Sequence, residues 1–116
     1  MTLCIMRNAT MLCTNVIMDE LSLDRWGDAQ KVRWKMISGT NETGITTTIQ
    51  LGWKRGREWY PFEGANAAAA QRSIWMFADV CLPGDFIPTA RFYVAAVGDM
   101  LVLTAAGELI EALPEL

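Results

Sequence analysis

The chain has 116 residues, which gives room for one hydrophobic core and a single domain spanning residues 1–116. Hydrophobic residues make up 52% of it, so it has ample apolar surface to offset chain entropy and is not a disordered chain. No window reaches the roughly 18 uninterrupted apolar residues of a membrane-spanning helix, because Arg7, Asn8 and Thr14 interrupt the apolar N-terminus. Composition therefore predicts a folded, soluble protein without a membrane partner.

The net charge of −3 conceals an uneven distribution of charge along the chain. Residues 31–58 hold six cations and two acids, whereas residues 63–116 hold two cations and seven acids. We expect a basic and an acidic surface on the same molecule.

Three cysteines are present, at positions 4, 13 and 81. An odd number without CxxC spacing argues against a disulfide framework and against zinc, and favours a reducing, cytoplasmic compartment. Residues 1–17 do not resemble a secretory signal, because Arg7 lies inside the apolar part and no cleavage pattern follows. The stretch from Met18 onward reads like an ordinary soluble N-terminus, which leaves open whether residues 1–17 are a dispensable addition to the domain.

The first 18 residues alternate apolar and small polar types loosely, which favours one or two short strands over a helix. The expected inward positions are Leu3, Ile5, Leu12, Val16 and Ile17. Residues 19–30 are acidic and contain the turn signal Gly27-Asp28, so we expect a loop or a single helical turn there.

Residues 31–38 alternate cleanly, with Val32, Trp34 and Met36 on one face and three cations on the other. This alternation predicts a half-buried strand with a basic outer face. Residues 39–44 are rich in turn formers and predict a hairpin loop.

Residues 45–53 have the β-branched content that strands prefer. A turn at Arg55-Gly56 leads to a short strand over residues 58–62, which Pro61 confines to a sheet edge or to its own end. Together with residues 31–38, these segments predict a three-stranded antiparallel meander.

Residues 67–82 carry an apolar stripe at helical spacing, preceded by Asn66 as an N-cap and stopped by Pro83-Gly84. They predict the main helix, with Trp75 and Met76 beside its solvent-exposed side.

Further on, residues 90–97 and 100–105 are apolar runs joined by Gly98-Asp99, which predicts a type II′ hairpin. Residues 108–113 fit a strand or a helical turn, and we prefer the strand.

The predicted fold is therefore α+β, with an antiparallel sheet of five or six strands arranged as meander, helix and hairpin. The helix over residues 67–82 is expected to pack across one face of that sheet. The expected core residues are Val32, Trp34, Ile49, Leu51, Ile74, Phe77, Val94, Leu101 and Leu103.

The residue types argue against catalysis. The chain has no histidine, which removes the commonest general base and the commonest metal ligand. It has no nucleophile elbow, P-loop or dinucleotide-binding glycine motif. We expect no enzyme activity, no cofactor and no bound metal.

The most unusual composition lies in residues 52–62, where aromatic and basic residues interleave. Such a cluster, with the cations of residues 31–35, is able to contact phosphates while Trp59 or Tyr60 stacks on bases, so a nucleic-acid-binding domain using residues 31–35 and 53–60 is the alternative function. The pI of about 4.8 argues against it. Trp34 and Trp53, at inward positions of their strands, are expected in the core.

A protein partner fits the same residues better, because interface cores are enriched in Trp, Tyr, Met and Arg. Small acidic domains without catalytic residues are often phage or mobile-element products that block or bridge larger assemblies, and by this analogy we expect a cytoplasmic, non-catalytic protein-binding module. The sequence leaves the partner's identity open, a second copy of the chain included. The predicted partner-binding residues are Arg33, Lys35, Lys54, Arg55, Arg57, Trp59, Tyr60, Trp75 and Met76.

Overall fold

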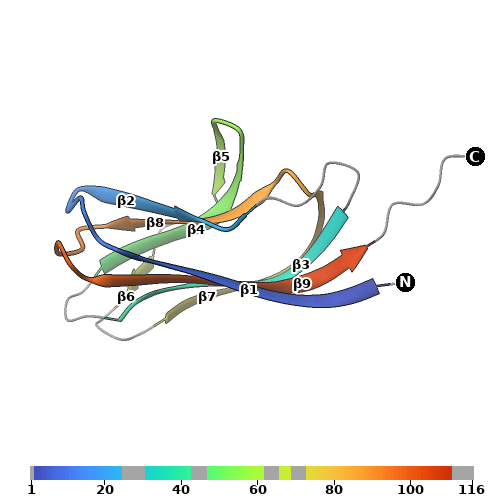
Figure 1. Ribbon diagram of the computed structural model, residues 1–116, viewed down its shortest axis with the longest axis horizontal. Helices are drawn as coiled ribbons and strands as arrows, with labels where there is room; N and C mark the ends of the chain where they lie inside the picture. The colour runs from blue at the N-terminus through green and yellow to red at the C-terminus, as the bar shows by residue number, and fades with distance from the viewer. Residues whose placement is uncertain (1, 25–30, 43–46, 62–65, 69–72, 111–116) are drawn as a thin grey trace, which may run out of the picture.

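The computed structural model describes residues 2–24, 31–42, 47–61, 66–68 and 73–110. These residues form nine β-strands and no helix (Figure 1). The strands are β1 (Thr2–Leu12), β2 (Met18–Ser22), β3 (Lys31–Asn41), β4 (Thr47–Arg55), β5 (Glu58–Pro61), β6 (Asn66–Ala68), β7 (Ser73–Pro83), β8 (Ile87–Tyr93) and β9 (Met100–Ile110).

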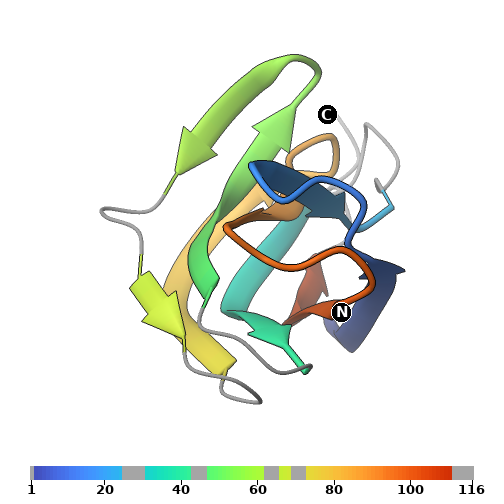
Figure 2. The ribbon, with the colours of Figure 1, turned by 90° about the vertical axis from the view of Figure 1, so that its left-hand side faces the viewer.

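The strands form two antiparallel sheets that face each other (Figure 2). Sheet A has the order β1-β9-β3-β7, and sheet B has the order β2-β8-β4-β5, with β6 also paired to β4. The chain crosses between the sheets after β1, β2, β3, β6, β7 and β8, so most strands that follow each other in sequence lie in opposite layers. When β5 and β6 are counted as two pieces of one edge strand, this is the eight-stranded order of a jelly roll.

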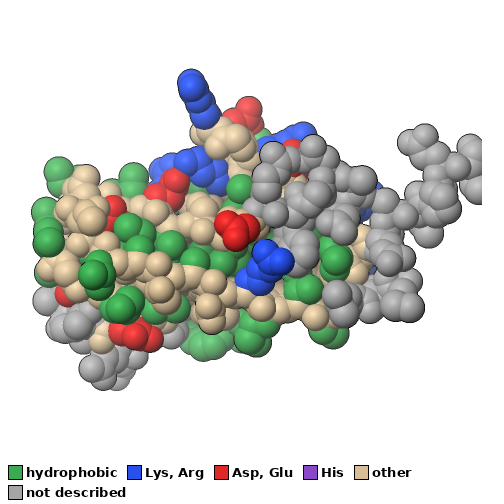
Figure 3. Space-filling model, viewed as in Figure 1, with side chains coloured by type: hydrophobic (Ala, Val, Ile, Leu, Met, Phe, Trp, Pro, Cys, Tyr) green, Lys and Arg blue, Asp and Glu red, His purple; other side chains and the backbone are tan. Residues whose placement is uncertain are grey.

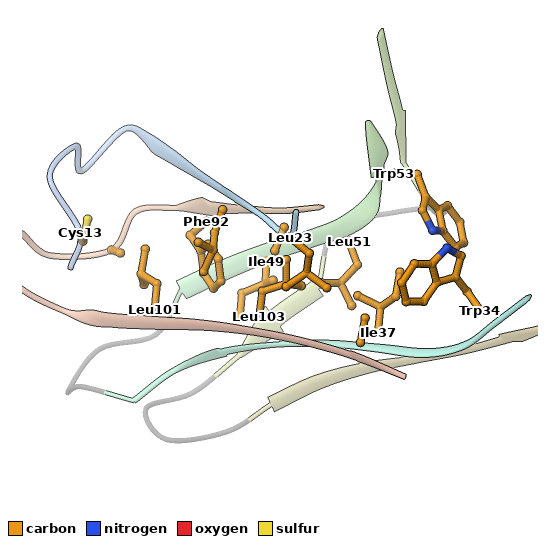
Figure 4. Close-up of a cluster of buried hydrophobic side chains, with 14 of the residues drawn as sticks. Cys13, Leu23, Trp34, Ile37, Ile49, Leu51, Trp53, Phe92, Leu101 and Leu103 are labelled. Atoms are coloured by element: carbon orange, nitrogen blue, oxygen red, sulfur yellow. The ribbon is translucent and has the colours of Figure 1, made fainter. Parts of the chain in front are cut away.

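The core lies between the sheets and is built from the inward side chains of both (Figure 4). Strand β9 shows the alternation most regularly, because Leu101, Leu103 and Ala105 are buried while the residues between them reach the outer face. Gly39 of β3 keeps the layers close: a Cβ there would lie 2.9 Å from Cγ2 of Ile49 in the opposite sheet. The elongated molecule measures 53 × 24 × 23 Å.

The α+β prediction is wrong, because the segment predicted as the main helix forms strands. Asn66 is the first residue of β6 and not a helix cap, residues 69–72 lie outside the described residues, and β7 follows. The apolar residues of β7 that pack against the core are Ile74, Met76, Val80 and Leu82. Pairing with β3 supplies backbone hydrogen bonds along one side of β7, and burial of its inward residues adds to this, so tertiary context overrides the local helical pattern.

The predicted strand pairings are correct only locally. The turn at Arg55-Gly56 does join the antiparallel pair β4 and β5. The predicted meander is wrong, because β3 and β4 lie in different sheets. The predicted hairpin of residues 90–105 is also wrong, because β8 and β9 lie in different sheets. A strand, β2, occupies Met18–Ser22, where a loop or helical turn was predicted.

The predicted core is largely confirmed, with two errors. Trp53 and six of the nine predicted residues are buried, and Ile74 packs partly buried against them. Phe77 and Val94 are instead exposed, and so are Leu12, Val16 and Ile17 of the N-terminal segment. The six buried residues are Val32, Trp34, Ile49, Leu51, Leu101 and Leu103.

The first prediction tests whether the segment of β7 is a strand, as in the structure, or the helix that the sequence pattern predicts. Ile37→Ala should lower the free energy of unfolding by about 2–5 kcal/mol, because it empties a fully buried site. Phe77→Ala should cost less than about 1 kcal/mol, since Phe77 projects into solvent. Urea denaturation measures both values, and a Phe77 cost equal to that of Ile37 would contradict the strand.

Candidate functional site

The predicted partner-binding residues are divided between two separate surfaces. Met76 joins neither, because it points inward and packs against the core. The members on the outer side of sheet A are Arg33, Lys35 and Trp75. The members on the β4–β5 hairpin are Lys54, Arg55, Arg57, Trp59 and Tyr60. This hairpin projects from the body of the sandwich (Figure 1).

Lys54 at the base of the hairpin belongs to a partly buried ion cluster. Glu20 of β2 accepts hydrogen bonds from Lys54 Nζ at 2.6 Å and from Arg91 Nε at 3.0 Å. Burial alone raises the pKa of Glu20, but the hydrogen bonds and charges of the two cations outweigh it, so the pKa lies below its ordinary value. Arg91 also covers the ring of Trp59, with 4.5 Å between its guanidinium carbon and the ring centroid.

The tip of the hairpin overhangs a pocket of about 560 Å³ lined by Arg55, Gly56, Glu58, Tyr60, Asp85 and Ile87. Arg55 Nε donates to Asp85 Oδ2 at 2.9 Å, and its guanidinium carbon lies 5.1 Å from the centroid of Phe86. The Tyr60 hydroxyl donates to Glu58, and that hydrogen bond raises the pKa of Tyr60. Each of these charged groups is therefore engaged with a neighbour within the protein.

The cations on sheet A are paired as well. Arg33 lies 3.7 Å from Asp79 and 3.9 Å from Glu108, and Lys35 Nζ lies 3.1 Å from Asp79 Oδ1. We call these four residues the charged belt. It crosses the outer side of sheet A beside a β-bulge, where the register of β3 shifts between Trp34 and Met36.

Beyond the bulge, the outer side of sheet A carries uncharged side chains in place of the charged ones. Antiparallel pairing aligns its outward side chains in rows that cross four strands. One row is Met6, Ala106, Met36 and Phe77, and the next is Asn8, Thr104, Ser38 and Trp75. We call these eight residues, with Thr10, Val102 and Thr40 of the following row, the uncharged face. Among the described residues, no charged side chain lies on sheet A's outer side from these rows to its end at Met100.

Three large side chains of the uncharged face project into solvent. Phe77 is 76% exposed, Met6 70% and Trp75 54%. The rings of Trp75 and Phe77 stack on each other, with centroids 6.3 Å apart and an interplanar angle of 10°. Hydrophobic side chains protrude along the lower edge of Figure 3, which is the outer side of sheet A.

Sequence reasoning identified Trp75 but missed Met6, Met36 and Phe77. These three residues lie in different strands and become neighbours only through the register of sheet A. For Met6 and Phe77 the available signal was an apolar residue in the outward half of the alternation of β1 and β7. Met36 gave no such signal, because only the bulge in β3 turns it outward.

A second group of exposed apolar residues lies at one end of the sandwich, at the end of β1 and on the loops β1–β2 and β8–β9 (left in Figure 3). The group, which we call the loop end, consists of Leu12, Val16, Ile17, Val94 and Val97. Backbone hydrogen bonds join the two loops, from Val94 N to Val16 O at 3.0 Å and from Cys13 N to Asp99 O at 2.8 Å.

Hydrogen bonds from polar groups link the two loops of the loop end. The Asp99 carboxylate accepts from Ala96 N and from Asn41 Nδ2, both at 2.9 Å. Burial raises the pKa of Asp19, but hydrogen bonds from the backbone of Thr14 and Asn15 outweigh this and lower it. Val94 has a φ of 65°, which is an outlier for a β-branched residue and stores strain in this loop.

The described residues give no indication of a metal centre or a membrane span. Within them, no three His, Cys, Asp or Glu side chains are grouped so that they could hold a metal ion. That part of the chain also contains no helix long and apolar enough to cross a membrane. All three cysteines are free thiols.

Comparison with known proteins adds little. No protein-family model and no curated protein matches the chain. Among solved structures, "Structure of infectious bursal disease virus Gt strain" is similar at a TM-score of 0.35 and 9% sequence identity. The match covers 90% of this chain and 31% of the viral chain, so this chain spans less than a third of the chain it matches. A likeness this weak supports no inference about function.

The second prediction concerns Glu20. Because its pKa is lowered in the folded state, its ion pairs stabilise the protein above the unfolded pKa of about 4.5 and lose that effect as pH falls through the lower folded value. Glu20→Gln should cost about 1–2 kcal/mol at pH 7, and this cost should shrink as the pH falls below 4.5 towards the lowered folded pKa. Thermal unfolding of both proteins across pH 3–7 measures this, and a cost independent of pH would contradict it.

The third prediction concerns the strain at Val94. Val94→Gly should stabilise the protein by about 1 kcal/mol, because glycine adopts positive φ without strain and the exposed valine side chain buries little. Gly98→Ala, at a φ of 91°, should do the opposite. Chemical denaturation measures both, and a loss of stability in Val94→Gly would show that the loop does not store strain there.

Proposed function

We propose that the protein is a non-catalytic protein-binding module and that its contact surface is the uncharged face. One observation carries this proposal: the apolar row Met6, Ala106, Met36 and Phe77, with Trp75 in the next row, crosses the outer side of sheet A without a charge among these residues. The solvent-facing side of an antiparallel sheet is ordinarily polar. Exposed apolar patches of this kind mark interaction sites in folded proteins.

The residue types of the uncharged face fit the centre of a protein interface. Aromatic residues and Met are enriched at interface cores, whereas charged residues are depleted there. Trp75 and Phe77 are already stacked, so they would lose little rotamer freedom when a partner covers them. The charged belt borders the face, as polar residues border a typical interface.

Nucleic-acid binding, the alternative, is less well supported. Arg33, Lys35, Lys54 and Arg55 are each within 4 Å of a carboxylate. A phosphate would have to compete with those carboxylates for the same cations, which reduces the gain from counterion release. Trp59, the expected stacking residue, is covered on one side by Arg91.

The proposed setting is a larger assembly in the cytoplasm that the module blocks or bridges. Three free thiols fit a reducing compartment. The loop end offers a second apolar surface on a different part of the molecule, which would allow one chain to touch two neighbours. The comparison with phage or mobile-element products is an analogy of size and composition.

The fourth prediction compares the two candidate surfaces directly. Phe77→Arg on the uncharged face and Tyr60→Arg on the hairpin both add a cation in place of an exposed aromatic side chain. In affinity capture from the source cell, quantified by mass spectrometry, Phe77→Arg should reduce specific capture at least about tenfold, as loss of a hot spot does.

Tyr60→Arg should capture as the wild type does, and both variants should keep the wild-type melting temperature. Capture that depends on Tyr60 and not on Phe77 would move the site to the hairpin. Capture that depends on neither would refute both surfaces.

A further inference from the structure

We infer that the loop end is a membrane-contact site, at which the loops β1–β2 and β8–β9 insert into the headgroup–acyl boundary of a bilayer of zwitterionic lipid. This inference goes beyond the proposed function, because the loop end is separate from the uncharged face. The sequence argues against a membrane partner only because no segment can span a bilayer, and shallow insertion needs no spanning segment. Three features of the loop end support the inference: its side chains, its backbone and its charge.

The large exposed side chains of the loop end are all aliphatic. Ile17 is 77% exposed, Val97 70% and Val94 65%, and Leu12 and Val16 are more than half exposed. Protein interface cores favour aromatic residues, Met and Arg, and Leu and Val are rare among binding hot spots. Hydrocarbon, in contrast, accepts aliphatic side chains readily. They lie at one end of the elongated molecule (Figures 1 and 3), so they can enter a bilayer tip first without a matching socket.

The strain at Val94 points to a role for its side chain outside the protein. Glycine or asparagine is the usual residue at a positive φ, and Val94 has a φ of 65°. Its side chain is too exposed to repay that strain by packing in the core. Strained residues of this kind cluster at functional sites. Contact with lipid accounts for a valine at this position.

The backbone of the two loops is already hydrogen-bonded within the protein. Polar groups that enter an apolar medium without a partner are costly, because no water is present to satisfy them. A loop that stays in water needs no such pairing, since water supplies it. The loop N–H groups that donate to acceptors in the protein are those of Cys13, Thr14, Asn15, Ile17, Val94, Ala96, Gly98 and Asp99.

The charge of the loop end determines which lipid it fits. Within residues 13–17 and 94–99 the one charged residue is Asp99, whose buried carboxylate accepts from Asn41 and Ala96. Asp19, just after the first loop, accepts from the backbone of Thr14 and Asn15. Neither loop holds a Lys or Arg, and the chain has a net charge of −3, so anionic headgroups would repel it. Zwitterionic lipid is therefore the suitable partner.

The test is co-sedimentation of the full chain with phosphatidylcholine vesicles. The exposed aliphatic groups together hold about as many carbon atoms as one fatty acyl chain, which predicts reversible binding with an association constant on the order of 10⁴ M⁻¹. Ile17→Ser combined with Val97→Ser should lower this constant at least about tenfold. Phe77→Arg should bind vesicles as the wild type does, and added phosphatidylserine should not tighten binding. Circular dichroism checks that every variant is folded.

Val94→Gly separates contact with lipid from a structural role. It removes an exposed aliphatic side chain and also relieves the strain at this residue. We expect a variant that is more stable than the wild type and yet binds the vesicles more weakly. A structural role alone would not change these two properties in opposite directions.

A wild type that does not bind phosphatidylcholine at millimolar lipid would overturn the inference. Binding that the double serine variant leaves intact, or that requires phosphatidylserine, would overturn it as well. If the vesicles stay unbound and the double serine variant loses a protein that the wild type captures, the loop end contacts protein and the bilayer is the wrong occupant. None of these outcomes decides the proposed function, which the capture experiment with Phe77→Arg tests separately.

Discussion

The β-bulge in β3 determines which side chains enter the core and which form the outer surface of sheet A. Without it, strict alternation would place Met36 on the same side as Val32 and Trp34, as the sequence pattern suggests. The bulge between Trp34 and Met36 reverses this alternation, so Ile37 enters the core and Met36 lies on the outer side. It also lies between the charged belt and the uncharged face. One irregularity thus sets the core and the candidate binding surface together.

The sequence predicts single strands of this protein better than their arrangement. The alternation in β3 and the β-branched residues of β4 identify both strands from local pattern alone. A jelly roll, however, sends neighbouring strands to opposite layers, and no local pattern encodes that. The β7 segment was misread because its apolar residues fit a helical stripe almost as well as a strand. Asp99 was predicted as a turn residue of a hairpin, whereas its carboxylate is a buried acceptor for Asn41.

The candidate surfaces show the same division between local and long-range information. The basic and aromatic residues of the β4–β5 hairpin are adjacent in sequence, so composition reveals them at once. The sequence does not show that Lys54 and Arg55 form ion pairs with Glu20 and Asp85, which lie far away along the chain. These pairs leave the two cations less available to a partner. The uncharged face depends on residues as distant as Met6 and Ala106, which only strand register brings together. Trp75 was predicted to be exposed because it lay outside the apolar stripe of the helix expected over residues 67–82, and it is exposed although that segment is a strand.

The central claim is that the outer side of sheet A is covered when the protein is in its working state. Hydroxyl-radical footprinting of the free protein and of the protein captured with its partner tests it most directly, because Met and aromatic side chains are oxidised in proportion to their exposure. The account predicts that oxidation of Met6, Trp75 and Phe77 is lower in the captured protein, while that of Tyr60 stays constant. Equal oxidation of the three residues in the free and the captured protein would contradict the account.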